Sequence, residues 1–210
     1  MPGAELNRLQ RHPLVQQLVQ SMSERPGRAV DVDVEVRRAA VLLTLRSRED
    51  GDLELLMIKR SDFEGDPWSG HIAFPGGRME PEDRDLAVTA LRETWEETGV
   101  DVAADGRVLG YLDELCPRNP HLPLLVIRPY VALVRADVRI VPSREVADAF
   151  WVPLSSLRTA DAWGTSTVSV RDQDRTVNVF RHGRHMVWGL TERVLRQFLE
   201  YVEQPRGRER

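Results

Sequence analysis

The sequence is poor in cysteine and in long apolar runs. Cys116 is the only cysteine, which excludes an intramolecular disulfide and a cysteine-rich metal site. No apolar run approaches the roughly 18 residues that a membrane helix needs. Arg8, Arg11 and Gln16 interrupt the N-terminal stretch where a secretory signal would be apolar. We therefore expect a cytoplasmic protein, in a reducing compartment, with no membrane partner.

An excess of charge of either sign is also absent. The 210 residues include 29 Lys+Arg and 33 Asp+Glu, for a formal net charge of -4. A nucleic-acid-binding protein normally carries a basic excess on one face, so we expect no nucleic-acid partner. Lys59 is the only lysine, and we interpret the preference for arginine as a compositional bias without functional weight. Hydrophobic residues make up 41% of the chain, enough for one large domain with a proper core.

The apolar periodicity predicts an α+β fold in which several strands accompany the helices. Helices are expected at residues 5–22, 85–98 and 189–202, the second of them closed by Gly99. Strands are expected at 38–45, 53–58, 107–113, 124–134 and 148–152, with weaker candidates at 165–170 and 176–181. This layout predicts an N-terminal helical extension at 1–30, a single domain at 31–203 and a frayed tail at 204–210.

The helix expected at 85–98 has two unlike faces. At about 100° per residue, Glu93, Glu96 and Glu97 fall within one arc of about 100°. The opposite arc, expected to face the core, holds Ala87, Val88, Leu91 and Trp95. Like charges at these spacings repel by tenths of a kcal/mol per pair, a penalty that a hard divalent cation such as Mg²⁺ can reverse. The pattern therefore indicates a metal site, although a solvated acidic face would show the same spacing.

A pair of glycines precedes this helix in the sequence Phe74-Pro75-Gly76-Gly77. Glycine lets the backbone approach a ligand closely or reach positive φ. At roughly 5–7% per residue type, a glycine pair at a fixed distance before Arg-Glu-x-x-Glu-Glu-x-Gly is very improbable by chance. The combination favours a ligand-binding turn that works together with the acidic helix.

These residues resemble the signature of a known family. Gly77-x5-Asp83 followed by Arg92-Glu93-Thr94-Trp95-Glu96-Glu97-Thr98-Gly99-Val100 looks like the motif of the Nudix hydrolases. That motif is a glycine, five residues, a glutamate, seven residues and then REUxEExGU, where U is aliphatic. Asp83 stands in place of the first glutamate, eight residues separate it from Arg92, and Thr94 occupies an aliphatic position. The REXXEEXG core is complete. The resemblance implies a Nudix-type α/β/α sandwich around a mixed sheet, with the motif forming loop-helix-loop.

The resemblance also implies roles by matched position. The implied ligands of Mg²⁺ or Mn²⁺ are Glu93, Glu96, Glu97 and the backbone at Gly77. Glu93 and Glu97 would take part in catalysis, Arg92 would orient the carboxylates, and Gly76 would contact the substrate. Members of the family attack a phosphorus of a diphosphate linked to another group, and the metal ion polarises a phosphoryl oxygen and activates water.

A further acidic residue lies well downstream. Many family members place a glutamate six residues before a tryptophan that starts a strand, and Glu145 stands six residues before Trp151. The match implies that Glu145 is an additional metal ligand or the general base, a role that Glu93 could also fill. An exposed loop acid without a function is the alternative.

Several segments resemble the coenzyme A pyrophosphatase branch of this family. Residues 70–77 match its GxxxFPGG pattern, and Arg60-Ser61 matches the end of its LLxxRS pattern with one extra residue. The longer spacing before Arg92 and the segment His185–Thr191 also resemble this branch, so the resemblance covers roughly residues 36–200. Arg60 becomes a candidate substrate contact. Trp68 could stack on a base, although a packed loop anchor has equal weight.

The loop before Gly70 departs from that branch. Its arginine is missing, and Glu64, Asp66 and Trp68 occupy the loop. Acidic groups are poor partners for the 3′-phosphate of coenzyme A, so dephospho-coenzyme A is expected to be used comparably unless Arg118 or Arg128 substitutes through folding.

Three functions stay open at this point. They are hydrolysis of coenzyme A or a derivative to 3′,5′-ADP and 4′-phosphopantetheine, hydrolysis of another nucleotide derivative, and ligand binding without catalysis. The expected partner is a small-molecule diphosphate substrate, and a homodimer is also open. His182 and His185 are not expected to bind a metal ion, because no third ligand accompanies them.

Overall fold

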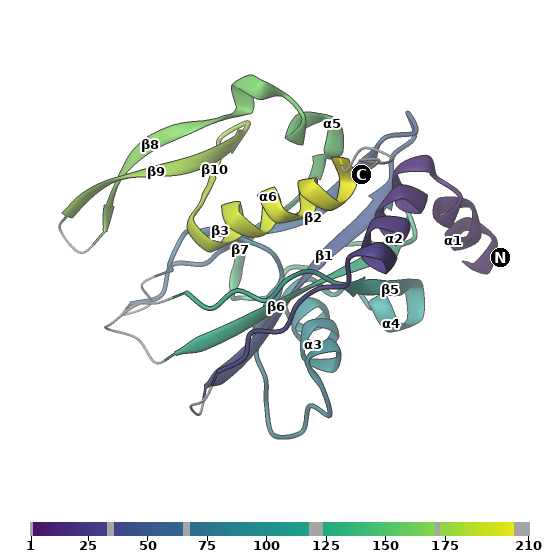
Figure 1. Ribbon diagram of the computed structural model, residues 1–210, viewed down its shortest axis with the longest axis horizontal. Helices are drawn as coiled ribbons and strands as arrows, with labels where there is room; N and C mark the ends of the chain where they lie inside the picture. The colour runs from purple at the N-terminus through teal and green to yellow at the C-terminus, as the bar shows by residue number, and fades with distance from the viewer. Residues whose placement is uncertain (1, 33–35, 65–67, 118–123, 171–172, 204–210) are drawn as a thin grey trace, which may run out of the picture.

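The computed structural model describes residues 2–32, 36–64, 68–117, 124–170 and 173–203. The N-terminal half contains α1 (Pro2–Gln10), α2 (Pro13–Glu24), β1 (Arg37–Ser47), β2 (Leu53–Arg60), β3 (Ile72–Ala73), β4 (Gly76–Arg78), α3 (Leu86–Thr98) and α4 (Val102–Asp105). The remainder contains β5 (Gly106–Tyr111), β6 (Leu125–Val134), β7 (Val146–Pro153), α5 (Leu154–Leu157), η1 (Ala160–Ala162), β8 (Trp163–Val170), β9 (Gln173–His182), β10 (His185–Trp188) and α6 (Gly189–Glu203). Figure 1 shows their arrangement.

The larger sheet is mixed, with the order β3-β2-β1-β6-β5. β1 and β6 are parallel, and the other pairs are antiparallel. The β1–β2 hairpin pairs only from Leu45 to Ser47 on β1. Toward its start β1 pairs with β4, while β2 pairs with β7 and β3. β1 and β2 therefore diverge. The turn between β3, which pairs with β2, and β4, which pairs with β1, connects the two diverging parts of the sheet.

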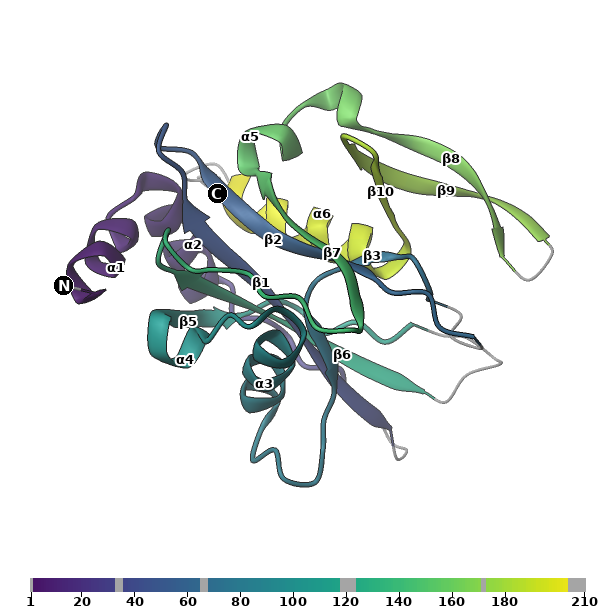
Figure 2. The ribbon, with the colours of Figure 1, turned by 180° about the vertical axis from the view of Figure 1, so that it is seen from behind.

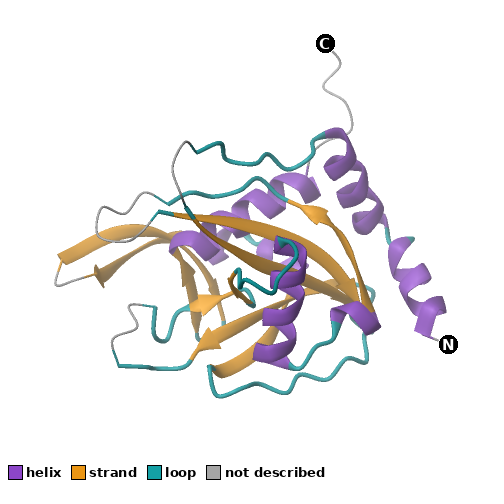
Figure 3. Ribbon diagram, turned by 90° about the horizontal axis from the view of Figure 1, so that it is seen from below, coloured by secondary structure: helices purple, strands orange, loops and turns teal. Residues whose placement is uncertain are grey.

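Helices cover both faces of this sheet (Figures 1 and 2). On one face α3 packs over an apolar cluster that includes Leu42, Leu56 and Ala90. On the other face α2 and α6 share a cluster that includes Leu18 and Phe198. Figure 3 views the molecule from the α3 side. The expected α+β sandwich around a mixed sheet is confirmed.

A second, three-stranded sheet has the order β10-β9-β8. Its β8–β9 hairpin extends away from the larger sheet in Figure 1, and these two strands lengthen the weaker candidates at 165–170 and 176–181. β10 has no counterpart among the predicted strands. It is only four residues long and pairs with the end of β9 through the turn at Gly183. A segment this short shows too few alternating positions for its sequence to predict a strand.

The predicted helix at 5–22 is in fact two helices. Pro13 begins α2, because its fixed φ suits a first helical position while its missing N–H breaks a continuing ladder. His12 caps α2 by accepting from the Leu14 N–H at 3.3 Å. Leu9 and Leu18 are buried in the cluster shared with α6. Residues 204–210, the predicted tail, lie outside the described residues.

The predicted core face of α3 is wrong in part. Trp95 is 58% exposed, and Val88 is only half-buried. The helix buries another face, which consists of Leu86, Thr89, Ala90, Thr94, Glu97 and Thr98. Threonine hydroxyl groups can be buried on this face because Thr94 and Thr98 each donate to the carbonyl four residues earlier, at 2.7 and 2.6 Å.

Among the described residues, no helix is both long enough and apolar enough to span a membrane.

Candidate active site

Arg92 is the centre of the charged network on α3. It donates from Nη1 to Glu93 Oε1 at 3.1 Å and to Glu96 Oε2 at 3.2 Å. Its Nε and Nη2 donate to the two oxygens of Asp83 at 3.1 and 2.9 Å. These bonds raise the pKa of Arg92 above its usual range, with the bond to Asp83 the largest cause and burial opposing it. The expected orienting role of Arg92 therefore has a geometric basis.

Asp83, which stands where the family motif has a glutamate, accepts hydrogen bonds from three residues. Besides Arg92, the Thr89 hydroxyl donates to its Oδ2 at 2.9 Å and the Glu80 N–H donates to the same oxygen at 2.9 Å. The Arg92 hydrogen bonds, opposed by burial, lower the pKa of Asp83 to about 2. The short, buried carboxylate thus holds the loop against α3 in its ionised form. Sequence reasoning missed Thr89, because a threonine inside a helix gives no distinctive signal.

Glu97 lies on the buried face of α3, apart from its two acidic neighbours. Its Oε2 accepts from the Gly76 N–H at 2.9 Å. Burial raises the pKa of Glu97 to about 8, the Gly76 hydrogen bond opposes this, and the negative charges of Glu93 and Glu145 add to it. Burial also raises the pKa of Glu93, while Arg92 lowers it. Burial without a sufficient positive partner therefore disfavours the ionised forms of both carboxyl groups.

The two glycines before α3 are required by close packing. Gly76 has φ of 153°, and a Cβ there would overlap the carbonyl oxygen of Ala40. A Cβ on Gly77 would overlap the carboxylate of Glu93. The turn therefore presses its backbone against the carboxylates of α3, as expected for a ligand-binding turn.

The fold brings Glu145 and Arg60 to the same place. The Ser143 N–H donates to the carbonyl of Glu97 at 2.9 Å, and the Ser61 N–H donates to the carbonyl of Glu145 at 2.8 Å. The segment before β7 thus joins the end of α3 to the end of β2. The negative charge of Glu145 raises the pKa of Glu93 and Glu97, and the positive charge of Arg60 lowers that of Glu97. The Glu145 side chain is exposed, so it can contact solvent.

These residues fit a divalent cation by the chemistry of their donors. Carboxylate and backbone oxygens suit Mg²⁺ or Mn²⁺. Burial, the largest cause of the raised pKa values of Glu93 and Glu97, disfavours their ionised forms, and a bound cation would favour those forms. Within the described part of the chain, no three His, Cys, Asp or Glu side chains already stand close enough to hold an ion. Arg92 holds the carboxylates of Glu93 and Glu96 instead, so ion binding has to draw the acids of α3 together.

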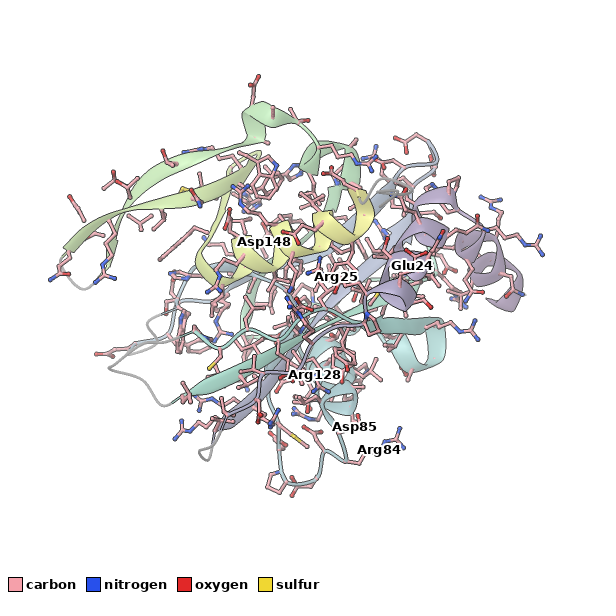
Figure 4. All side chains as sticks on the ribbon, viewed as in Figure 1. Glu24, Arg25, Arg84, Asp85, Arg128 and Asp148 are labelled. Carbon is pink, nitrogen blue, oxygen red and sulfur yellow. The ribbon has the colours of Figure 1, made fainter. Side chains whose placement is uncertain are left out.

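Other candidates have different surroundings. Arg128, labelled in Figure 4, donates to Glu114 at 2.8 Å and lies 4.6 Å from the Tyr111 ring, so an internal pair occupies it. Arg118 lies outside the described residues. Trp68 is 38% exposed on the loop before β3, and its stacking role stays a prediction. His185 stacks on Phe150 with 3.9 Å between ring centroids.

Known proteins share both the sequence pattern and the fold. The family model of the NUDIX domain matches residues 36–171. The "Uncharacterized Nudix hydrolase NudL" of Photorhabdus laumondii subsp. laumondii is 31% identical over 168 residues, which cover 80% of this chain and 86% of that protein. The protein of the same name from Yersinia pestis is 32% identical over 167 residues, covering 79% of this chain and 80% of that protein.

Among solved structures, a MutT/nudix family protein from Enterococcus faecalis has a TM-score of 0.56 and 18% identity. The match covers 96% of this chain and 74% of that one, and it shows that the fold is shared. The family model spans more than half of the chain, including the glycine turn, α3 and Glu145. The chain therefore belongs to the Nudix hydrolase family.

Proposed function

We propose that this Nudix hydrolase cleaves the diphosphate linkage of coenzyme A or an acyl derivative, releasing 3′,5′-ADP and 4′-phosphopantetheine. The hydrolytic part rests on one observation, the contact of Gly76 and Gly77 with the carboxylates of Glu97 and Glu93. The substrate part rests on the GxxxFPGG pattern at 70–77, the longer motif and the segment at 185–191. Nudix hydrolases act on nucleoside diphosphate derivatives in general, so the proposal narrows a shared chemistry.

The residues divide the work of hydrolysis among them. Glu93, Glu96, Glu97 and the backbone at Gly77 would hold Mg²⁺ or Mn²⁺, and the bound ion would supply polarisation of the diphosphate and activation of water. Glu145 takes the proton from the attacking water, because its side chain is exposed and its charge acts on Glu93 and Glu97. Arg92 keeps the carboxylates oriented.

The substrate is held close to these groups. Gly76 and Arg60 contact the diphosphate, and Trp68 stacks on the substrate base. Water adds to one phosphorus as the bridging P–O bond breaks, and the bridging oxygen leaves on the other phosphate. We further place the enzyme in the cytoplasm, because its single cysteine suits a reducing compartment.

Two other functions compete with this proposal. A nucleotide sugar, a dinucleotide or a modified nucleoside triphosphate would place its diphosphate on the same carboxylates. The acidic loop residues Asp62 and Glu64 favour this alternative, because they oppose an added phosphate. A ligand-binding domain without catalysis is disfavoured by the complete carboxylate set of α3.

A substrate screen with product identification tests the proposal. The full chain is incubated with Mg²⁺ or Mn²⁺ and coenzyme A, acetyl-coenzyme A, nucleotide sugars, dinucleotides or nucleoside triphosphates, and the products are identified by mass spectrometry. We expect 3′,5′-ADP from coenzyme A, and none from the Glu97→Gln variant. Cleavage of a nucleotide sugar or dinucleotide without cleavage of coenzyme A contradicts the proposed substrate.

Light scattering on the same sample determines whether the protein is a homodimer.

A further inference from the structure

A group of basic side chains lies at the end of β2, on the face of the sheet opposite α3. Lys59 alternates with Met57, which belongs to the apolar cluster shared with α6, whereas Arg60 acts on Glu97 of α3. Lys59 pairs across the strands with Asp148 of β7, which is labelled in Figure 4. Residues directly opposite in an antiparallel pair share a face. Both side chains therefore project toward β10 and α6.

The turn between β9 and β10 brings two further basic residues to Asp148. Arg184 Nη2 donates to Asp148 Oδ2 at 2.6 Å, and His185 Nε2 lies 3.6 Å from the same oxygen. The His185 ring stacks on Phe150 of β7, with planes inclined by 6°. Asp148 and Phe150 therefore fix Arg184 and His185 beside β2, although more than a hundred residues separate them from Lys59.

Much of the donor capacity of this group remains unused. The Lys59 side chain makes no hydrogen bond or ion pair with the residues that the structure describes. The Arg184 side chain is 79% exposed and engages Asp148 through one nitrogen, while a guanidinium carries five N–H donors. Burial lowers the pKa of His185 and the charges of Arg184 and Lys59 add to this, with Asp148 opposing. Arg184 and His185 thus meet at Asp148, and the charge of Lys59 acts on His185.

The loop before β3 also reaches this group. A side chain built on Gly70 would come within 4.0 Å of Lys59 Cε and 3.2 Å of Asp62 Oδ1. In addition, the rings of His71 and Trp188 lie 4.6 Å apart, which joins this loop to β10. The described end of this loop, at Gly70 and His71, therefore lies beside Lys59 and β10.

We propose that Lys59, Arg184 and His185 bind a phosphate monoester that the substrate carries away from its scissile diphosphate. The inference rests on the proposed function, which supplies a substrate with such a group. A dianionic phosphate suits the charged donors of Lys59 and Arg184, and the imidazole of His185 adds a neutral ring donor. Lys59 and Arg60 are neighbours on opposite faces of one strand end. A substrate whose diphosphate lies at Arg60 can extend around that end to Lys59. The sequence offered no cation between Ser61 and Gly70; Lys59 of β2 and Arg184 of the β9–β10 turn supply the cations.

Steady-state kinetics with coenzyme A and dephospho-coenzyme A tests this subsite, because the two compounds differ only in the 3′-phosphate. We expect a kcat/KM preference for coenzyme A of about 10-fold or more, the effect of a few charge-assisted hydrogen bonds. Lys59→Gln should remove most of that preference, and Lys59→Arg should retain it. The control is Arg175→Gln, which removes an equal charge from the exposed part of β9 and should leave the preference unchanged.

Binding separates this inference from the proposed function if neither compound is cleaved. Calorimetry on the full chain compares adenosine 3′,5′-bisphosphate with AMP, which lacks the 3′-phosphate. Selective weakening of the bisphosphate by about 10-fold in Lys59→Gln supports the subsite even without turnover. Equal use of coenzyme A and dephospho-coenzyme A, or equal binding of the two nucleotides by the wild type, overturns it. A preference that Lys59→Gln does not change overturns it as well.

Discussion

Single carboxylates in this protein differ in protonation because their surroundings differ. Glu97 and Asp83 are both buried, yet the pKa of Glu97 is raised to about 8 and that of Asp83 is lowered to about 2. Glu97 has one neutral donor, the Gly76 N–H, and negative neighbours. Asp83 has the Arg92 guanidinium. An ionised Glu97 would therefore need a nearby cation of the kind that Arg92 supplies to Asp83.

Replacing Glu97 with glutamine tests its catalytic role. The amide oxygen of the substituted side chain can still accept from the Gly76 N–H, so the fold should persist, while the charge proposed to hold the metal ion is lost. We expect a loss of several kcal/mol of transition-state stabilisation, measured as kcat/KM with Mg²⁺ or Mn²⁺. Glu82→Gln, at an exposed loop position, is the matched control. Near-wild-type turnover of Glu97→Gln, or full wild-type activity in excess chelator, contradicts the assignment.

Glu145 requires a separate test, because a base and a loop acid predict different kinetics. If Glu145 is the general base, Glu145→Gln lowers kcat by about 10²–10⁴-fold with little change in substrate affinity. The acidic limb of the pH–rate profile should also disappear, since that limb reports protonation of the base. A decrease in kcat below about tenfold would mean that Glu145 is only a minor metal ligand or an exposed loop acid without a catalytic role.

At the scale of elements, the loop from Glu80 to Asp85 is joined to α3 mainly through Asp83. The loop begins with the Glu80 N–H bond to Asp83, and Asp85, labelled with Arg84 in Figure 4, caps the helix by accepting from the Val88 N–H at 2.9 Å. The helix ends at Gly99, which has φ of 70° and donates to the carbonyl of Trp95. These contacts fix the direction in which α3 presents its acids.

The lowered pKa of Asp83 makes its contribution to stability dependent on pH. Its folded pKa of about 2 lies below the ordinary value of 3.8, so the folded state favours the ionised form. This stabilisation is fully present above about pH 4 and is lost as the pH falls toward 2. We expect Asp83→Asn to lower the free energy of unfolding at pH 7, and the difference from wild type to shrink at pH 3. Urea titrations at both values measure it, and a difference independent of pH contradicts the ion pair.

At the scale of the whole molecule, the N-terminal helices complete the core. Val15 and Leu18 of α2 are buried in the same cluster as Phe198 of α6 and Leu43 of β1. Asp113 strengthens this side, since the Arg28 N–H donates to it at 2.9 Å and Arg25 at 3.2 Å. The extension expected at residues 1–30 thus covers one face of the sheet, opposite α3.

Adjacent residues on α2 allow a controlled test of this packing. Leu18 is 1% exposed and Val19 is 45% exposed. We expect Leu18→Ala to reduce the free energy of unfolding by about 2–5 kcal/mol, through lost burial and a cavity. Val19→Ala should change it by less than about 0.5 kcal/mol. Urea unfolding measures both, and equal effects would mean that α2 does not support the sheet as packed here.

The sequence alone determined the parts of this protein that depend on local pattern. The α+β class, the extents of α3 and α6, the positions of β1 and β2, and the acids of α3 all follow from periodicity, capping and motif spacing. Local pattern wrongly predicted one continuous helix across His12, where Pro13 begins a second helix. It also wrongly placed Trp95 in the core, although this side chain is exposed to solvent. It could not show that Thr94 and Glu97 are buried. A polar side chain can be buried when it is hydrogen-bonded, and the partner of Glu97 is Gly76, which is distant in the sequence.

Only the tertiary structure decided which distant residues share a site. Strand pairing brings Glu145 and Arg60 to α3, and the β9–β10 turn brings Arg184 and His185 to Lys59. The physical reason is that charges act through distance in space, whereas a sequence records only distance along the chain. Lys59 shows the difference most clearly. The sequence could not show that its strand position sets it opposite Asp148, with which Arg184 is paired.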